Sequence, residues 1–303
     1  MTTSPRKILF SGASGLIGAS LVRAAEAERI QTLQLIRREP RKPEEISWNP
    51  QAGQPVRDLA LLERLDAAIH LSGANISAQR WNAARKREIV ESRVGSTRAL
   101  LKVLMALKQP PATLLCASAT GIYGERGDEI LDEESPPGEG FIADTCRAWE
   151  AEASAASEAG IRVVHLRFGV VLAAEGGALG RMLPVFRLGL GGNLGSGRQW
   201  MSWIALNDVV RAIFYILDAG ALRGPLNIIA PNPVTNAEFT RALGRSLHRP
   251  AMIPVPRFAL RLAFGEMADE VLLASTRAVP DRLLQAGFTF ELSNLDSALK
   301  AIL

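Results

Sequence analysis

The sequence predicts an α/β fold: a doubly wound parallel sheet of the Rossmann type, followed by a smaller C-terminal α+β region. Three observations predict it. Apolar runs of strand length alternate with longer helix-like stretches, a glycine-rich turn follows the first run, and the composition changes after about residue 172.

The strand-like runs are short and mostly apolar. In chain order they are KILFSG, TLQLIRR, AAIHLSG, TLLCASAT and VVHLRFGVVL. Runs of this kind indicate strands of a parallel sheet that helices cover on both faces. Between the third and fourth runs, residues 82–107 carry charge early and apolar side chains late, which predicts one long packed helix.

The glycine-rich turn GASGLIG occupies residues 12–18, directly after the first strand-like run and before a helix-like stretch. Glycines at this spacing permit a tight turn, a close approach of the backbone to a diphosphate, and close packing of helix on strand. The diphosphate then lies on free amides at the positive end of the helix. The pattern predicts a dinucleotide site formed by Gly12, Ser14, Gly15, Leu16, Ile17 and Gly18.

The end of the second strand favours NADP(H) over NAD. NAD enzymes usually place an acidic residue there for the ribose 2′-hydroxyl, whereas this chain has Arg37 and Arg38. Two guanidinium groups can pair with a 2′-phosphate and stack on adenine. The alternative is that both arginines are solvated surface charges.

The length and the composition shift suggest two parts. A chain of 303 residues exceeds the usual size of a single domain. After residue 172 the stretches GGALG, GLGGNLGSG and RPAMIPVPRF replace the regular alternation. We therefore expect a dinucleotide-binding domain over 1–172, a smaller C-terminal substrate region over 173–303, and a return of residues 205–230 to the first domain.

Composition and charge argue against several classes of protein. The net charge is +4, and no run of Lys and Arg interleaves with aromatic residues, so no nucleic-acid partner is expected. No apolar stretch is long enough to span a bilayer, and the start MTTSPRKILF contains no apolar signal region, which predicts a cytoplasmic protein without a membrane partner. Cys116 and Cys146 lack metal-ligand spacing, so no metal site is expected.

Several separated motifs carry a family resemblance. They are the GxxGxxG turn, HLSGA at 70–74, SATGIYG at 118–124 and WIALND at 203–208. Together they resemble the extended short-chain dehydrogenases/reductases. The chain is most similar to the atypical subgroup of epimerase-family proteins of unassigned substrate, and the similarity extends through the C-terminal RPAMIPVP and FGEMADEVLLASTRAVPDRLLQAGF. The resemblance implies that Ser72, Gly73, Ala74 and Ser118 also contact the cofactor.

The same resemblance implies an unusual catalytic centre. The family uses a Ser, a Tyr that transfers the proton, and a Lys that lowers the pKa of the Tyr. Ser118 is retained, but aligning FIADTCRAWE on the family's YxxxK helix places Ile142 at the Tyr position and Cys146 at the Lys position. Arg93 stands where the family has Asn. Ordinary Tyr/Lys catalysis is excluded, because an isoleucine carries no proton and a thiol supplies no positive charge.

Three residues are candidates to replace the missing pair. Tyr123 has a phenol near Ser118, Arg93 could stabilise a developing oxyanion, and Cys146 could act as acid or nucleophile if its pKa is depressed. The alternatives are that Tyr123 packs under the cofactor, that Arg93 holds loop carbonyls, and that Cys146 is a small buried hydrophobic residue.

The stretch GSGRQWMSWI at 195–204 bears on the substrate. Nucleotide-sugar epimerases that it resembles have an Arg for the diphosphate where Met201 stands, and a methionine cannot pair with a phosphate. Arg198 is near enough in sequence to compensate. The simpler expectation is a less anionic, more apolar substrate flanked by Trp200 and Trp203, unless both rings belong to the core.

The sequence thus favours an NADP(H)-dependent oxidoreductase that acts on a small-molecule substrate of unknown identity. A catalytically silent NADPH-binding sensor, which would present a surface to a protein partner, is the alternative from a different class. Nucleotide-sugar epimerisation is disfavoured by Met201 and Ile142. Extended family members often dimerise through the helix that corresponds to residues 82–107, so the resemblance implies a homodimer.

Overall fold

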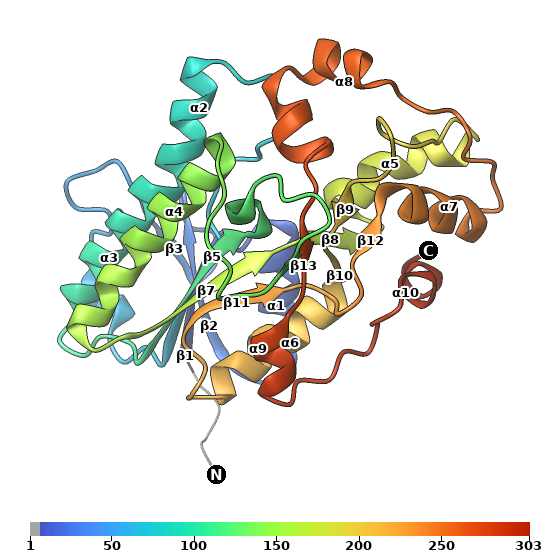
Figure 1. The fold of residues 1–303 in the computed structure, drawn as a ribbon. Coiled ribbons are helices and arrows are strands. Elements are labelled where there is room, and N and C mark those ends of the chain that lie inside the picture. The colour runs from blue at the N-terminus through green and yellow to red at the C-terminus, as the bar shows by residue number, and fades with distance from the viewer. Residues whose placement is uncertain (1–6) are drawn as a thin grey trace.

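Seven parallel strands form the central sheet of the computed structural model, which describes residues 7–303 (Figure 1). They lie in the order β11-β7-β5-β4-β1-β2-β3, and the two halves of the sheet meet between β1 and β4. This is the strand order of a doubly wound dinucleotide-binding sheet, so the predicted fold class is confirmed. The bounds are β1 Lys7–Ser11, β2 Gln31–Ile36, β3 Glu45–Ser47, β4 Ala67–His70, β5 Thr113–Ala119, β7 Arg162–Phe168 and β11 Gly224–Ile228.

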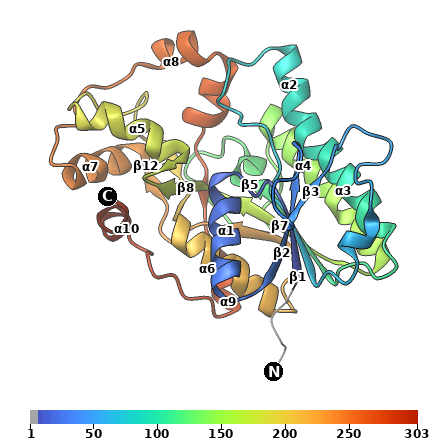
Figure 2. The same cartoon turned by 180° about the vertical axis from the view of Figure 1, so that it is seen from behind.

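Helices cover both faces of the sheet, which explains why its strands are apolar throughout. In β1, Ile8 and Phe10 face one core while Leu9 faces the other. The first face is covered by α1 (Leu16–Ala27), α6 (Leu206–Asp218) and α9 (Asp281–Gln285). The second is covered by α3 (Ser96–Met105) and α4 (Phe141–Ser154), and Figures 1 and 2 show the two layers from opposite sides.

The helical run between β4 and β5 is long, as the sequence predicts for residues 82–107. It comprises α2 (Ala83–Val90), the π-helical segment η2 (Glu91–Gly95) and α3, which follow one another without a break in helical backbone. The Asn82 side chain caps its start by accepting a hydrogen bond from the Arg85 amide at 2.8 Å. The prediction of one long packed helix is confirmed, and η2 marks the point at which it passes the site described below.

The C-terminal part of the chain builds a third core beside the sheet. Leu183, Trp203, Phe239 and Leu299 are among its buried members. The chain leaves the sheet after β7 and returns to it with α6 and β11. The elements around this core are β8 Val170–Ala173, α5 Gly177–Arg187, β9 Trp200–Met201, β10 Trp203–Ala205, β12 Val234–Thr235, α7 Asn236–Ser246 and α10 Leu295–Ile302.

The segment from α8 (Arg257–Phe264) through η5 (Ala268–Leu272) to β13 (Arg277–Ala278) crosses back to the sheet domain. There β13 pairs in parallel with the short strand β6 (Ile130–Leu131). We call residues 257–278 the strap. The remaining short helices are η1 Leu59–Leu62, η3 Thr120–Tyr123 and η4 Ala155–Ala159.

Candidate functional site

Two cavities meet at the carboxyl ends of the sheet strands. The β2 cavity, of about 510 Å³, lies beyond β1, β2 and β4, and the β5 cavity, of about 420 Å³, lies beyond β1 and β5. Gly12, Gly15 and Leu71 line both of them. The crevice where the strand order reverses is the place at which doubly wound sheets bind ligands, and these cavities occupy it.

The glycine-rich turn between β1 and α1 has the shape that a diphosphate requires. Gly12 has φ +77°, and a Cβ there would lie 2.7 Å from the Leu71 carbonyl carbon. A Cβ on Gly18 would lie 2.2 Å from the Gly12 oxygen. No side chain caps the start of α1, where Ser14 and Gly15 are exposed, so the first amides of the helix are open to a ligand. The turn therefore fits a dinucleotide diphosphate.

The two predicted arginines both line the β2 cavity, but they differ in their partners. Arg38 donates from Nη1 and Nη2 to the Glu45 carboxylate at 2.8 and 2.5 Å. This pairing, with a further hydrogen bond from the Arg41 amide, lowers the pKa of Glu45 to about 2. Arg37 is exposed, and no hydrogen bond or ion pair engages its side chain within residues 7–303. Arg37 thus has an unengaged guanidinium among the described residues, whereas Arg38 neutralises Glu45.

The segment after β4 forms another wall of the β2 cavity. Ser72, Gly73 and Ala74 all line it. The Ala74 amide donates to Ser92 Oγ at 2.9 Å, and the Ala74 carbonyl accepts from Arg93 Nη2 at 3.1 Å. Helix residues thus hold the loop in place beside the space that the glycine turn opens.

Ser118 lies at the end of β5 and lines the β5 cavity. Its hydroxyl donates to Glu150 Oε1 at 2.6 Å. Glu150 is in turn bound by Arg167, with Nε–Oε1 at 2.9 Å and Nη2–Oε2 at 3.0 Å, and both side chains are almost fully buried. Neither Glu150 nor Arg167 is among the site residues that the sequence predicts. An arginine inside the apolar run VVHLRFGVVL was the available signal, because a buried guanidinium requires a carboxylate or several acceptors.

Helix α4 presents Ile142 and Cys146 to the β5 cavity, one turn apart. Ile142 closes the space over η3, since a Cβ on Gly121 would lie 2.5 Å from Ile142 Cγ2. Burial raises the pKa of the Cys146 thiol to about 11. The nucleophile role depends on a depressed pKa, and burial shifts the pKa of this thiol in the opposite direction. Cys146 is buried, which agrees with the alternative that it is a small hydrophobic residue of the cavity wall.

Tyr123 does not reach the cavity, and its prediction as a replacement proton donor is wrong. The 3-10 turn η3 directs the phenol into the interior, where it is fully buried. Its oxygen accepts from Arg167 Nη1 at 2.9 Å and lies 2.8 Å from Asn227 Oδ1 and 2.9 Å from the Asp132 carbonyl. Burial raises the pKa of Tyr123 to about 12. The phenol is a structural group beneath the Glu150–Arg167 pair.

Arg93 extends from η2 into the wall of the β5 cavity. Nη1 donates to the Ile89 carbonyl and Nη2 to the Ala74 carbonyl, each at 3.1 Å. The alternative that Arg93 holds loop carbonyls describes the contact with Ala74, which lies in the loop after β4, whereas Ile89 belongs to helix α2. Of the four predicted catalytic residues, the cavity brings together Ser118, Cys146 and Arg93.

The tryptophans expected around the substrate lie elsewhere. Trp203 is fully buried in the third core, with its indole donating to the Asn232 carbonyl. Trp200 donates to Asp128 and stacks under Arg277 at 4.1 Å. Neither ring lines the β5 cavity, and the burial of Trp203 agrees with the alternative that this ring belongs to the core. The apolar lining comes instead from Ile76, Ile142, Phe168, Val170, Val171 and Ala178.

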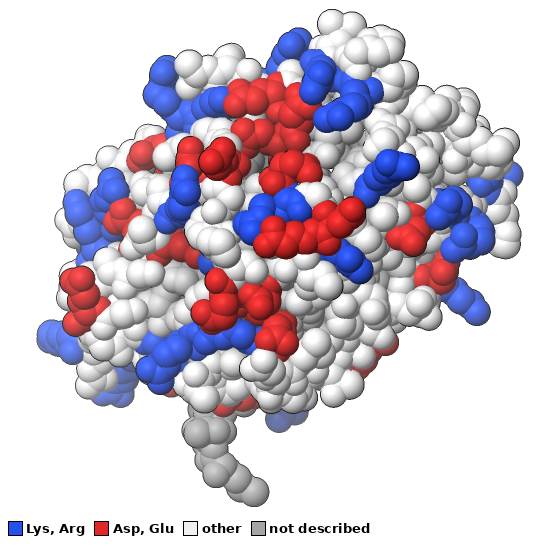
Figure 3. All heavy atoms as spheres, in the orientation of Figure 1, with Lys and Arg blue, Asp and Glu red and all other residues white. Residues whose placement is uncertain are grey.

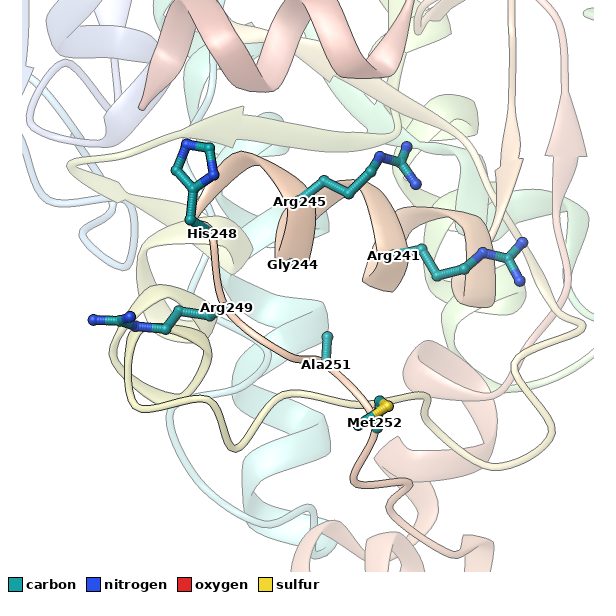
Figure 4. A pocket seen from close by; sticks show the side chains of 7 residues that line it. All are labelled: Arg241, Gly244, Arg245, His248, Arg249, Ala251 and Met252. Atoms are coloured by element: carbon teal, nitrogen blue, oxygen red, sulfur yellow. The ribbon is translucent and has the colours of Figure 1, made fainter.

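A third hollow, of about 670 Å³, lies at the end of α7 and in the loop that follows (Figure 4). Its basic side chains point in different directions, as Figure 4 shows. Arg245 pairs with Asp296 at 2.7 Å, and Arg249 Nε donates to the Arg187 carbonyl at 3.0 Å. These cations do not converge on a common point, so we assign this hollow no site.

The remaining observations concern surface charge, metal ligands and membrane-spanning helices. Acidic and basic side chains are interspersed on the face in Figure 3. Within residues 7–303, no cluster of three or more His, Cys, Asp or Glu side chains is arranged to hold a metal ion. Over the same residues, no helix combines the length and apolar character needed to cross a bilayer. Residues 1–6, which bear on the expected lack of a signal region, lie outside the described residues.

Comparison with known proteins decides the family. The model of the NAD dependent epimerase/dehydratase family matches residues 8–228, and a domain of unknown function (DUF1731) matches residues 255–302. The chain belongs to the NAD dependent epimerase/dehydratase family. The family resemblance seen in the sequence is therefore confirmed, including its C-terminal portion.

Relatives of this family match nearly the whole chain. An epimerase family protein of Mycobacterium bovis is 44% identical over 292 residues, which cover 96% of each chain. The crystal structure of the human epimerase family protein SDR39U1 (isoform 2) with NADPH is 33% identical, with a TM-score of 0.87 and 98% of each chain covered. A nucleoside-diphosphate sugar epimerase from Corynebacterium glutamicum is 35% identical, with a TM-score of 0.79, over 99% of this chain and 58% of that one.

Proposed function

We propose that this chain is an NADP(H)-dependent oxidoreductase that acts on a small molecule at the β5 cavity. The observation that carries the proposal is the junction of the two cavities at Gly12 and Gly15. A dinucleotide whose diphosphate rests on the glycine turn can extend into both cavities, and this brings its nicotinamide end towards Ser118. The human relative crystallised with NADPH supports the choice of cofactor.

The residues that would hold the cofactor follow from this arrangement. The amides of residues 14–18 and the dipole of α1 suit the diphosphate. Arg37 suits the 2′-phosphate, since Arg38 is committed to Glu45. Ser72, Gly73 and Ala74 line the cavity on the opposite side. When bound, the cofactor supplies or accepts a hydride.

The chain's own residues bind and orient the substrate without a Tyr/Lys pair. Ser118 donates its only proton to Glu150, so its oxygen offers lone pairs to a hydroxyl group in the cavity. Ile142 and Phe168 provide apolar walls that exclude water from the reacting atoms. Orientation and a water-poor site lower the barrier to hydride transfer even without a dedicated proton donor.

The first test is the preference for NADPH. Purified protein should bind NADPH more tightly than NADH, as measured by calorimetry and by the shift in Tm. Arg37→Ala should reduce this preference by roughly tenfold to a hundredfold, the range for hydrogen bonds to a charged group. Arg41→Ala is the matched control, because its exposed side chain lines neither cavity. Equal affinities of the wild type for NADPH and NADH would contradict the assignment of Arg37.

A second candidate is a catalytically silent NADPH-binding sensor. Ile142 and Cys146 at the positions of the family's proton-transferring pair favour it, as does the burial of Tyr123. A screen of small carbonyl compounds and alcohols with bound cofactor separates the two functions. Turnover that falls in Ser118→Ala supports the oxidoreductase, whereas NADPH binding without turnover of any compound supports the sensor.

Nucleotide-sugar epimerisation is the least supported of the three. Met201, at the position where such enzymes have an arginine, packs against the third core, with Asn236 Nδ2 at 3.7 Å from its sulfur. A thioether there offers no charge to a sugar-nucleotide diphosphate. Binding of UDP-glucose with a Kd in the micromolar range would reopen this possibility.

A further inference from the structure

Arg93 carries a partly buried guanidinium, and no carboxylate of the described residues pairs with it. Within residues 7–303, no Asp or Glu oxygen lies within 4.0 Å of its side-chain nitrogens. Burial lowers its pKa from the usual value, because a charge that leaves water without a counter-ion is destabilised. The Ile89 and Ala74 carbonyls and the Trp149 ring offset part of this cost, and the guanidinium keeps N–H groups that an anionic or polar ligand in the cavity can accept.

Contacts on several sides fix the position of the guanidinium. It lies against the loop after β4, where a Cβ on Gly73 would be 3.2 Å from Arg93 Cζ. On the other side, Cζ lies 5.3 Å from the centre of the Trp149 ring, and Trp149 follows Cys146 by one turn of α4. Arg93 therefore spans the space between the cofactor loop and the helix that carries Cys146.

This cavity has a positive charge at Arg93 and lacks one at Cys146, where the family has a lysine. In the extended short-chain dehydrogenases/reductases that the chain resembles, the cation belongs to a lysine on the helix equivalent to α4, at the position of Cys146. Here that position holds a neutral thiol, and the facing segment η2 holds an arginine at the position of the family's asparagine. A lysine at 146 would place a second positive charge beside Arg93, so the site has room for only one of the two cations.

We propose that Arg93 supplies from η2 the positive charge that the family's lysine supplies from α4, and that it binds the nicotinamide-ribose half of NADPH. The proposal rests on the NADP(H) binding proposed above. A guanidinium suits this position better than an ammonium, since it can hold the Ala74 and Ile89 carbonyls and still present N–H groups to a ligand. Arg93 is thus a cofactor-positioning residue.

The test compares two ligands that differ by the half of the cofactor in question. NADPH contains the nicotinamide ribose, whereas adenosine 2′,5′-bisphosphate reaches only the β2 cavity. In calorimetric titrations, Arg93→Met should weaken NADPH binding by about tenfold or more, a loss of about 1.4 kcal/mol. Its affinity for adenosine 2′,5′-bisphosphate should stay within about twofold of the wild type. Arg87→Met, an exposed position on α2, is the control for the loss of one charge.

A double variant tests directly whether the positive charge can act from α4 as well as from η2. Arg93→Met/Cys146→Lys returns the cation to α4 and should recover most of the NADPH affinity that Arg93→Met loses. Should Arg93→Met fail to fold, as judged by its circular dichroism and Tm, Arg93→Gln carries the same expectations, because it removes the charge and keeps a donor for the loop carbonyls.

Three outcomes would overturn the proposal. One is NADPH binding that is unchanged in Arg93→Met, and another is an equal loss for both ligands, which would make Arg93 a support of the loop only. The third is a double variant as weak as Arg93→Met. Failure of the wild type to bind either ligand is a different result, because it would contradict the proposed function itself.

Discussion

Replacing Glu150 with leucine should destabilise the protein strongly. The carboxylate neutralises Arg167, and the exposed fractions of the two side chains are only 12% and 7%. Glu150→Leu leaves that guanidinium buried without its counter-ion and deprives Ser118 of its acceptor. Removing one partner of a buried ion pair costs about 3–5 kcal/mol. A loss of this size should lower the Tm on the order of 10 °C.

The assay is equilibrium unfolding in urea, followed by circular dichroism, with a matched pair as control. Glu152 lies two residues further along α4 and pairs with Arg98, whose side chain is 59% exposed. The Glu152 side chain is 18% exposed, but its partner Arg98 stays solvated when the carboxylate is removed. Glu152→Leu should therefore cost no more than about 1 kcal/mol. The double variant Glu150→Leu/Arg167→Met should recover much of the loss, since it replaces the buried pair with apolar groups. Equal costs for Glu150→Leu and Glu152→Leu would refute the reasoning.

Three further predictions concern other groups. Burial raises the pKa of Cys146 to about 11 and that of Cys116 to about 12. Thiol reagents at pH 8 should therefore label the native protein slowly and the urea-unfolded protein fast. Rapid labelling of the native protein would contradict this expectation. Glu270→Ala should cost about 1–2 kcal/mol of unfolding free energy by removing the acceptor at the start of α4, and the exposed Glu266→Ala serves as its control. The pKa of buried His70 is lowered to about 3, so the unfolded chain binds an extra proton below about pH 6.5. The unfolding free energy should therefore fall by about 2 kcal/mol between pH 7 and pH 5, and His70→Asn should flatten this dependence.

The sheet and the cofactor turn were predictable because local sequence determines them. Buried parallel strands are apolar on both faces, so the run containing Ile8, Leu9 and Phe10 identifies β1 without tertiary information. Gly12 and Gly18 are required by contacts a few residues away or with the neighbouring strand. The apolar run and the glycine spacing can each be recognised within a short window of sequence, although the contact that excludes a side chain at Gly12 comes from Leu71.

The chemistry of the β5 cavity was harder to predict, since it depends on where side chains point after folding. Tyr123 lies five residues after Ser118, yet η3 turns its phenol away from the cavity and under Arg167. Glu150 stands at the end of the stretch FIADTCRAWE with no spacing that marks it as a site residue, although its carboxylate holds both Ser118 and Arg167. Pairs between distant strands and helices leave no periodic signal. The sequence signal for the buried ion pair was Arg167, a charged residue within the apolar run VVHLRFGVVL.

The capping of α4 by the strap also bears on how the protein is made. Both carboxylate oxygens of Glu270 accept backbone hydrogen bonds, from Phe141 and Ile142, each at 2.9 Å. On the ribosome, Phe141 emerges 129 residues before the side chain that completes its helix. A nascent chain therefore carries an unfinished site helix until translation is almost over. For the same reason the C-terminal region cannot be exchanged freely between relatives. A chimera that replaces it must retain a carboxylate acceptor for the amides at the start of α4.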